Sequence, residues 1–168
     1  MCIYKEYLKN DEKAEVQYVK HNESIFYDIE KITVGNKNLT EMVEFHFSVY
    51  VTEKYATFAI NTENCENYGL GTFLINSMLD ILKTYNIRFV AGKLSTADYE
   101  NGNWERSIPF YLKKLPNSYI VEAYENKSIR YFYNMIIERS KKLKYFYDKE
   151  SFIKRNLGKK DGYVICPL

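Results

Sequence analysis

Residues 43–61 carry the pattern that most restricts how this chain can fold. Valine and phenylalanine occupy every second position from 43 to 51, and glutamate, histidine and serine lie between them at 44, 46 and 48. A period of two places one side of a strand on a core and the other toward solvent. After a short connection at residues 52–54, apolar side chains alternate again over residues 55–61. The sequence therefore predicts an antiparallel hairpin.

A glycine turn and a helix follow this hairpin. Residues 62–68 are polar and lead into the tripeptide Gly-Leu-Gly at 69–71. From residue 74 to 85 apolar side chains recur at spacings of three, four and seven, which predicts an amphipathic helix that ends at Asn86. Residues 88–94 have the composition of a strand that is buried on both faces. The order strand, helix, strand predicts a parallel pair with a right-handed crossover, so we expect a mixed sheet.

The flanking segments predict further elements. Within the first forty positions, alternating apolar residues predict short strands near 16–18 and 25–29, with turns at 21–24 and 35–38. Further along we expect a polar loop at 96–103, a short helix at 104–115 that contains Pro109, and a strand at 119–124. Residue types predict another strand at 129–137, entered through a hairpin turn at 126–128. Helix within 138–155 and a closing strand at 163–166 complete the expected order.

These elements place the chain in the α+β class, with a central mixed, largely antiparallel sheet and a helix that begins at the glycine turn. The length of 168 residues fits one domain, and three prolines and seven glycines mark no linker, so we expect a single domain over 1–168. Three cysteines at spacings that fit neither a disulfide framework nor a zinc site indicate a reducing compartment. With no signal-peptide pattern and no apolar run near the roughly 20 residues of a membrane span, we expect a cytoplasmic protein that uses no metal.

Charge is distributed unevenly along the chain. The formal net charge is only +2, which is too small to argue for nucleic acid as a partner. Residues 127–160 nevertheless hold eleven Lys and Arg against three Asp and Glu. The C-terminal quarter is therefore basic on a mildly acidic body, either as a solvated face or as a surface for phosphates or an acidic partner.

A glycine turn between a strand and a helix suits the binding of a phosphate or pyrophosphate. The first amides of a helix have no intrahelical partner, the helix dipole adds positive charge there, and glycine lets a ligand approach the backbone. A plain tight turn would also account for the two glycines taken alone. Leu74 stands where a dinucleotide-binding loop needs its third glycine, and no Gly-Lys-Ser/Thr follows to form a nucleotide-triphosphate loop.

Residues 43–115 resemble the GNAT superfamily of N-acetyltransferases. In that family a Gln or Arg is followed, after two residues, by Gly-x-Gly, and residues 66–71 match this loop with Glu66 in the first position. A long amphipathic helix, a strand and a segment ending in Phe-Tyr-x-Lys come next in the family, and residues 107–115 contain that segment. The resemblance implies acetyl-CoA as co-substrate and direct acetyl transfer to an amine. The N-terminal third, with strands instead of two helices, and the C-terminal forty residues depart from the family.

The resemblance also implies the residues of the site. Those expected to bind coenzyme A are Ile60, Asn61, Asn67, Tyr68, Gly69, Leu70, Gly71 and Thr72. Tyr111 is the first choice for the proton donor to the leaving thiolate, and Tyr147, in a second Phe-Tyr-x-Lys segment, is the alternative if residues 97–136 are an insertion. His46 and Glu53 are the candidates for a general base, although a solvated strand position also accounts for each. Proton removal through water, without a dedicated base, stays open.

Two functional hypotheses follow. The first is an acetyl-CoA-dependent N-acetyltransferase. The second is a non-catalytic module that binds acyl-CoA, or that binds an acidic partner or nucleic acid through the basic segment; Glu66 and the lack of a clear base motivate it. The sequence does not indicate the acceptor amine, and a homodimer is one option for the oligomeric state.

Overall fold

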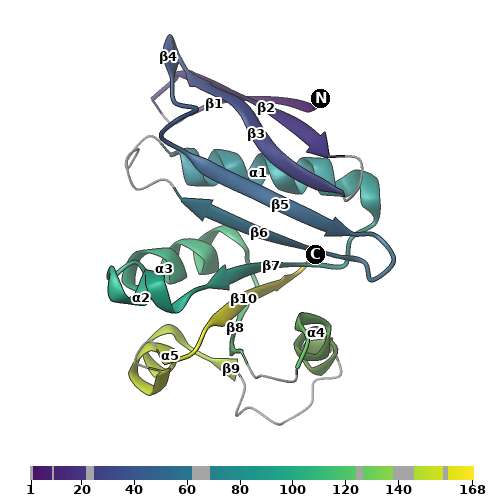
Figure 1. Ribbon diagram of the computed structural model, residues 1–168, viewed down its shortest axis with the longest axis vertical. Coiled ribbons are helices and arrows are strands. Elements are labelled where there is room, and N and C mark those ends of the chain that lie inside the picture. Colours follow the sequence, from purple (N-terminus) through teal and green to yellow (C-terminus); the bar gives the residue numbers. More distant parts are fainter. Residues whose placement is uncertain are drawn as a thin grey trace. The chain divides into compact units, whose positions relative to one another are not determined.

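The structure is a computed structural model, and its alternating strands match the period of two in the sequence. It describes residues 2–8, 10–21, 25–61, 69–123, 127–137, 146–156 and 159–168. The chain forms two compact units, Met1–Ile87 and Arg88–Leu168. Both combine strands with helices, so the α+β class is confirmed (Figure 1). That the two units make one domain, and that strands on either side of the first helix pair in parallel, stay predictions.

The first unit is built on an antiparallel sheet. Its strands are β1 (Cys2–Tyr7), β2 (Lys13–His21), β3 (Phe26–Val34), β4 (Lys37–Asn38), β5 (Glu44–Tyr50) and β6 (Tyr55–Asn61). They lie in the order β1-β2-β3-β5-β6, with β4 paired to β3, and every pairing is antiparallel. The predicted hairpin of residues 43–61 is therefore confirmed, as are the strands of the first forty residues.

Helix α1 (Leu70–Leu82) covers one face of this sheet (Figure 1). It continues as the 3-10 helix η2 (Lys83–Tyr85) and ends at Asn86, whose left-handed conformation stops the helix where the sequence predicts it. Apolar side chains recur along its inner side and are buried, among them Phe73, Leu74, Met78 and Leu82. On the sheet they meet the face that carries buried Tyr18, Phe45 and Phe47, whose rings contact one another. The core of this unit lies between these two layers.

One buried polar contact ties α1 to the sheet. The hydroxyls of Tyr18 on β2 and Ser77 on α1 are 2.5 Å apart, and both residues are fully buried. Because the Ser77 hydroxyl donates its proton to the carbonyl oxygen of Leu74, 2.8 Å away, the Tyr18 hydroxyl must donate to Ser77. Burial raises the pKa of Tyr18, so this donor stays protonated. The contact fixes α1 at one position along β2.

We expect Ser77→Ala to lower the free energy of unfolding by about 1–3 kcal/mol, because it leaves the buried Tyr18 hydroxyl without an acceptor. The double variant Tyr18→Phe with Ser77→Ala should lose less than Ser77→Ala alone, since it removes both partners together. Urea unfolding of the two single variants and the double variant measures this. Simple addition of the two single effects would contradict the assigned contact.

The strands of the second unit also pair antiparallel with one another, and helices lie between them along the chain. It contains β7 (Phe89–Leu94), α2 (Thr96–Glu100), α3 (Trp104–Lys114), β8 (Tyr119–Glu122), α4 (Ile129–Ile137), β9 (Phe146–Tyr147), α5 (Lys149–Asn156) and β10 (Gly162–Pro167). The strand order is β7-β10-β8-β9. The strands predicted at 88–94, 119–124 and 163–166 are confirmed, and the first four residues of β7 are all buried. The helix predicted at 104–115 is confirmed as α3. Pro109 lies inside this helix and cannot donate a backbone hydrogen bond, and burial of Trp104, Ile108 and Tyr111 along one side offsets that loss.

Two predictions for this unit are wrong. Residues 129–137 form α4 instead of a strand, because Phe132, Met135 and Ile136 are buried at helical spacing and the Ser128 hydroxyl accepts a hydrogen bond from the first-turn amide of Tyr131. Ser128 therefore begins a helix and is not part of a hairpin turn. The polar loop predicted at 96–103 contains the short helix α2 at its start.

The helix predicted within 138–155 is found in part. Residues 138–145 lie outside the described part of the chain, residues 146–147 are strand β9, and α5 begins only at Lys149. The Asp148 carboxylate accepts hydrogen bonds from the amide and the hydroxyl of Ser151, which caps the start of α5.

Candidate functional site

The start of α1 is the strongest candidate site. Gly69 precedes the helix with φ 73° and ψ 10°, a left-handed conformation that favours glycine. Gly69 has no side chain to cap the helix, and within the described residues no side-chain cap is found at this position. The first intrahelical bond is donated by the amide of Phe73 to the carbonyl oxygen of Gly69, over 3.2 Å. The amides of residues 70–72 therefore precede the hydrogen-bonded ladder and have no acceptor within the helix.

The described residues around this turn favour an anion. The first turn of α1 contains no acidic residue. Leu70 is buried and holds the turn against the core, whereas Gly71 and Thr72 are half-buried and Gly69 is exposed. Among the described residues, no atom lies within 4 Å of where a Gly69 Cβ would be. Free amides, the positive end of a helix dipole and open space are the components of a phosphate site.

The other residues predicted to bind coenzyme A are described only in part. Asn67 and Tyr68 lie outside the described residues. Ile60 and Asn61 end β6, where Ile60 is half-buried opposite Phe45 and Asn61 is exposed opposite Glu44. These two positions lead into the segment that reaches the glycine turn.

The two candidate bases are not brought together with that turn. His46 lies on the exposed face of β5, the face opposite to the one that α1 covers, and its ring is 5.5 Å from the ring of Phe26. Glu53 is exposed in the turn between β5 and β6, so the whole length of β6 separates it from Asn61. At about 3.3 Å per residue this is more than roughly 20 Å.

The two tyrosines proposed as proton donors belong to the second unit. Tyr111 lies on α3 and is 5% exposed, and its ring centre is 5.4 Å from that of Phe110. The backbone of Tyr147 pairs with Ile120 in the β8–β9 ladder, while its side chain is not described. Only Tyr111 can therefore be placed as a buried side chain.

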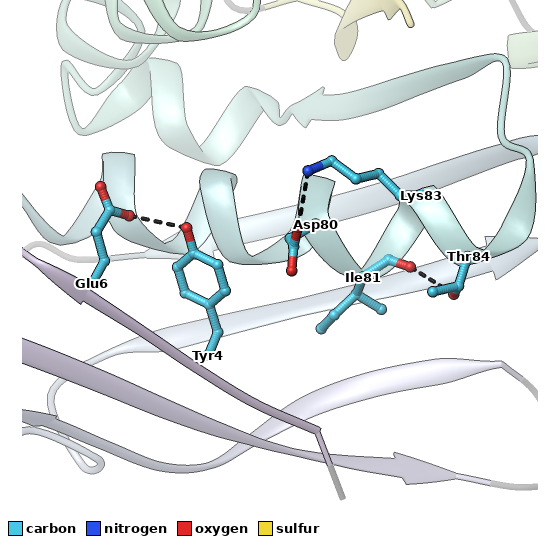
Figure 2. Close-up of polar contacts among 6 residues, drawn as sticks. All are labelled: Tyr4, Glu6, Asp80, Ile81, Lys83 and Thr84. Atoms are coloured by element: carbon cyan, nitrogen blue, oxygen red, sulfur yellow. Dashed lines mark hydrogen bonds and ion pairs between the residues drawn. The ribbon is translucent and has the colours of Figure 1, made fainter.

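A group of polar side chains beside α1 was not predicted from the sequence (Figure 2). The Tyr4 hydroxyl on β1 donates to Glu6. Glu6 also accepts hydrogen bonds from the side-chain amide of Asn76 at 3.2 and 3.4 Å. Burial and the neighbouring Glu6 carboxylate raise the pKa of Tyr4. Further along α1, Asp80 pairs with Lys83 at 2.9 Å (Figure 2). The alternation of residues 2–7 was the signal that would have placed Tyr4 and Glu6 on one face.

Among the described residues, no three His, Cys, Asp or Glu side chains gather as metal ligands. Within the same residues, no helix is long and apolar enough to cross a membrane.

The fold is similar to solved GNAT domains. The match to the GNAT domain of PAT from S. lividans covers 99% of this chain and 97% of the PAT chain, with a TM-score of 0.57 and 8% sequence identity. The structure of Tetrahymena GCN5 matches 92% of this chain and 68% of its own, with a TM-score of only 0.42 and 15% identity, and it adds no weight. No protein-family model matches the sequence, and neither does any curated protein. The chain thus has the GNAT fold, as the resemblance of residues 43–115 to that family implies.

We expect Gly69→Ala to lower the free energy of unfolding by about 1–2 kcal/mol, because alanine is disfavoured in the left-handed region. Gly102→Ala is a matched control and should cost a similar free energy of unfolding, since Gly102 has φ 71° and equally open surroundings in the described residues. Gly69→Asn should cost less than Gly69→Ala, because asparagine tolerates this conformation. Thermal unfolding measures all three, and an unchanged stability of Gly69→Ala would contradict the left-handed start of α1.

Proposed function

We propose that this protein is an acetyl-CoA-dependent N-acetyltransferase that transfers acetyl directly to an amine. The observation that carries the proposal is the start of α1. A left-handed glycine, a first turn free of acidic side chains and three amides outside the helical ladder follow β6 in a chain with the GNAT fold. This arrangement supports binding of the pyrophosphate of coenzyme A.

Binding of the cofactor and stabilisation of the transition state would use different protein groups. The amides of residues 70–72 would hold the pyrophosphate, and Asn67 and Tyr68 would complete the loop. A backbone amide at the end of β6, at Ile60 or Asn61, would stabilise the negative charge that the thioester oxygen acquires. The neutral amine attacks the carbonyl carbon, and the carbon–sulfur bond breaks to release a thiolate that takes up a proton.

We assign that proton to Tyr111, with Tyr147 as the alternative. Tyr111 is supported by its place on α3, the second helix after β7, and by the burial of its side chain. For the proton of the amine, the exposure of both His46 and Glu53 supports removal through water more than a dedicated base.

The same exposure favours one competing function. A module that binds acyl-CoA without turning it over would keep the start of α1 and need neither a base nor a proton donor. For either function a cytoplasmic location is supported by Cys2 and Cys166, which are both free thiols.

Acetyl-CoA should raise the thermal unfolding midpoint of the wild type. At 100 times its dissociation constant, a ligand stabilises a protein by about 2.7 kcal/mol, which corresponds to roughly 5–11 °C for a chain of this size. Gly71→Glu should abolish the rise, because it puts a carboxylate among the amides that would hold the pyrophosphate.

Thr84→Glu provides the control for added charge. It adds the same charge about 20 Å away at the other end of the helix, beyond the screening length at physiological salt (Figure 2). This variant should keep the rise in midpoint. The absence of a rise in the wild type would contradict the proposed cofactor.

Replacement of the proton donor should slow turnover and leave binding intact. We expect one of Tyr111→Phe and Tyr147→Phe to lower kcat by about 10²–10⁴-fold with little change in the KM for acetyl-CoA. The control is Tyr119→Phe, at an exposed position of β8, which should keep full activity. Equal activity in all three variants would overturn the tyrosine assignment, and acetyl-CoA binding without turnover of any amine would favour the non-catalytic function.

A further inference from the structure

The outer edge of β1 has the properties of a pairing surface. β1 is the end strand of the sheet in the first unit, and among the described residues no strand lies on its outer side (Figure 1). Its ladder with β2 is regular over all six residues, without a bulge or a proline. Such an edge presents a row of unpaired amide and carbonyl groups that can accept another strand.

Two exposed apolar side chains lie on this strand. Ile3 is 51% exposed and Tyr7 is 70% exposed, and both project from the face of the sheet that α1 does not cover. Proteins usually protect an edge strand with charge, yet the one lysine of β1, Lys5, is held by Glu15 on the neighbouring strand at 2.8 Å. The edge is therefore open to pairing.

We propose that β1 pairs antiparallel with β1 of a second copy of this chain, so that two sheets join into one across a two-fold axis. A two-fold axis perpendicular to the sheet keeps each face on the same side, so opposite residues must come from the same face. This condition leaves two central registers, with the axis at Lys5 or at Tyr4.

The register centred on Lys5 uses the side chains of β1 best. It places Ile3 opposite the partner's Tyr7, so both exposed apolar side chains gain a cross-strand contact. On the other face it places Tyr4 opposite the partner's Glu6, the acceptor that the Tyr4 hydroxyl uses at 3.2 Å within its own chain (Figure 2). With the axis at Tyr4, Ile3 would face the partner's Lys5, and Tyr7 would lie beyond the paired residues.

One pair in this register opposes it. The two Lys5 side chains face each other across the axis, which is unfavourable for like charges. Each lysine is already paired with Glu15, so the two ammonium groups lie between two carboxylates. The alternation of charge offsets the repulsion. Because Lys5 lies on the two-fold axis, a cysteine at this position can test the register.

Light scattering of the wild type should give a molar mass that approaches twice the 20.0 kDa of one chain as concentration rises. Ile3→Lys and Tyr7→Glu should each weaken self-association by roughly tenfold or more, because each puts a charge opposite an apolar side chain. An equal mixture of the two variants should regain dimers, since the heterodimer pairs the new lysine with the new glutamate. Met42→Lys, at an apolar position of similar exposure outside β1, should leave the association unchanged.

Cross-linking tests the register. Lys5→Cys should form a disulfide between chains under mild oxidation, since directly opposite residues have Cα atoms about 4.5–5.5 Å apart, within the range that a disulfide spans. Ile3→Cys, which faces Tyr7 instead of itself, should cross-link no more than the wild type. A wild type that stays at 20.0 kDa at every soluble concentration, or a dimer that neither charged variant weakens, would overturn the proposal. Cross-linking of Ile3→Cys in preference to Lys5→Cys would overturn the register.

Discussion

The contact between the apolar side of α1 and one face of the antiparallel sheet determines where the first turn of α1 lies in the first unit. Burial of aromatic and aliphatic side chains supplies most of its free energy, but such packing alone has little axial preference. The hydrogen bond from Tyr18 to Ser77 supplies that preference, since a shift of α1 by one turn would leave a buried hydroxyl without a partner. The direction in which the first amides of α1 point thus follows from a contact more than one turn further along the same helix.

Electrostatics distinguishes the two ends of α1. Its first turn has no acidic side chain, and the amides of residues 70–72 have no acceptor within the helix. Beside later turns Glu6 accepts from the side-chain amide of Asn76, and Asp80 of α1 pairs with Lys83 (Figure 2). An anion is therefore favoured at the start of the helix, and the charged groups further along have partners in the chain itself. This asymmetry connects the fold of the first unit to the proposed binding of a pyrophosphate.

Local patterns predict an element well when one period accounts for its burial. The hairpin of residues 43–61 and the helix after Gly71 have clear periods, β7 has a continuous apolar run, and all three elements are present. Residues 129–137 are rich in isoleucine, tyrosine and phenylalanine, which favour strands by type, while their helical spacing of buried positions becomes visible only in the structure. The position of Glu53 was implicit in the predicted hairpin, because a turn between two strands lies at the opposite end from the residue that leaves the second strand.

The sequence by itself determined the alternation of the strands, the apolar side of α1 and the left-handed turn at Gly69, because each depends on residues that are neighbours along the chain. Only the tertiary structure decided which distant groups meet. Ser77 accepts from a tyrosine 59 positions away, and the first amide of α2 donates to Asp161, 65 positions away. The open edge of β1 likewise depends on the strand order of the whole unit. Such contacts follow from topology, which places segments side by side without leaving a periodic signal in either of them.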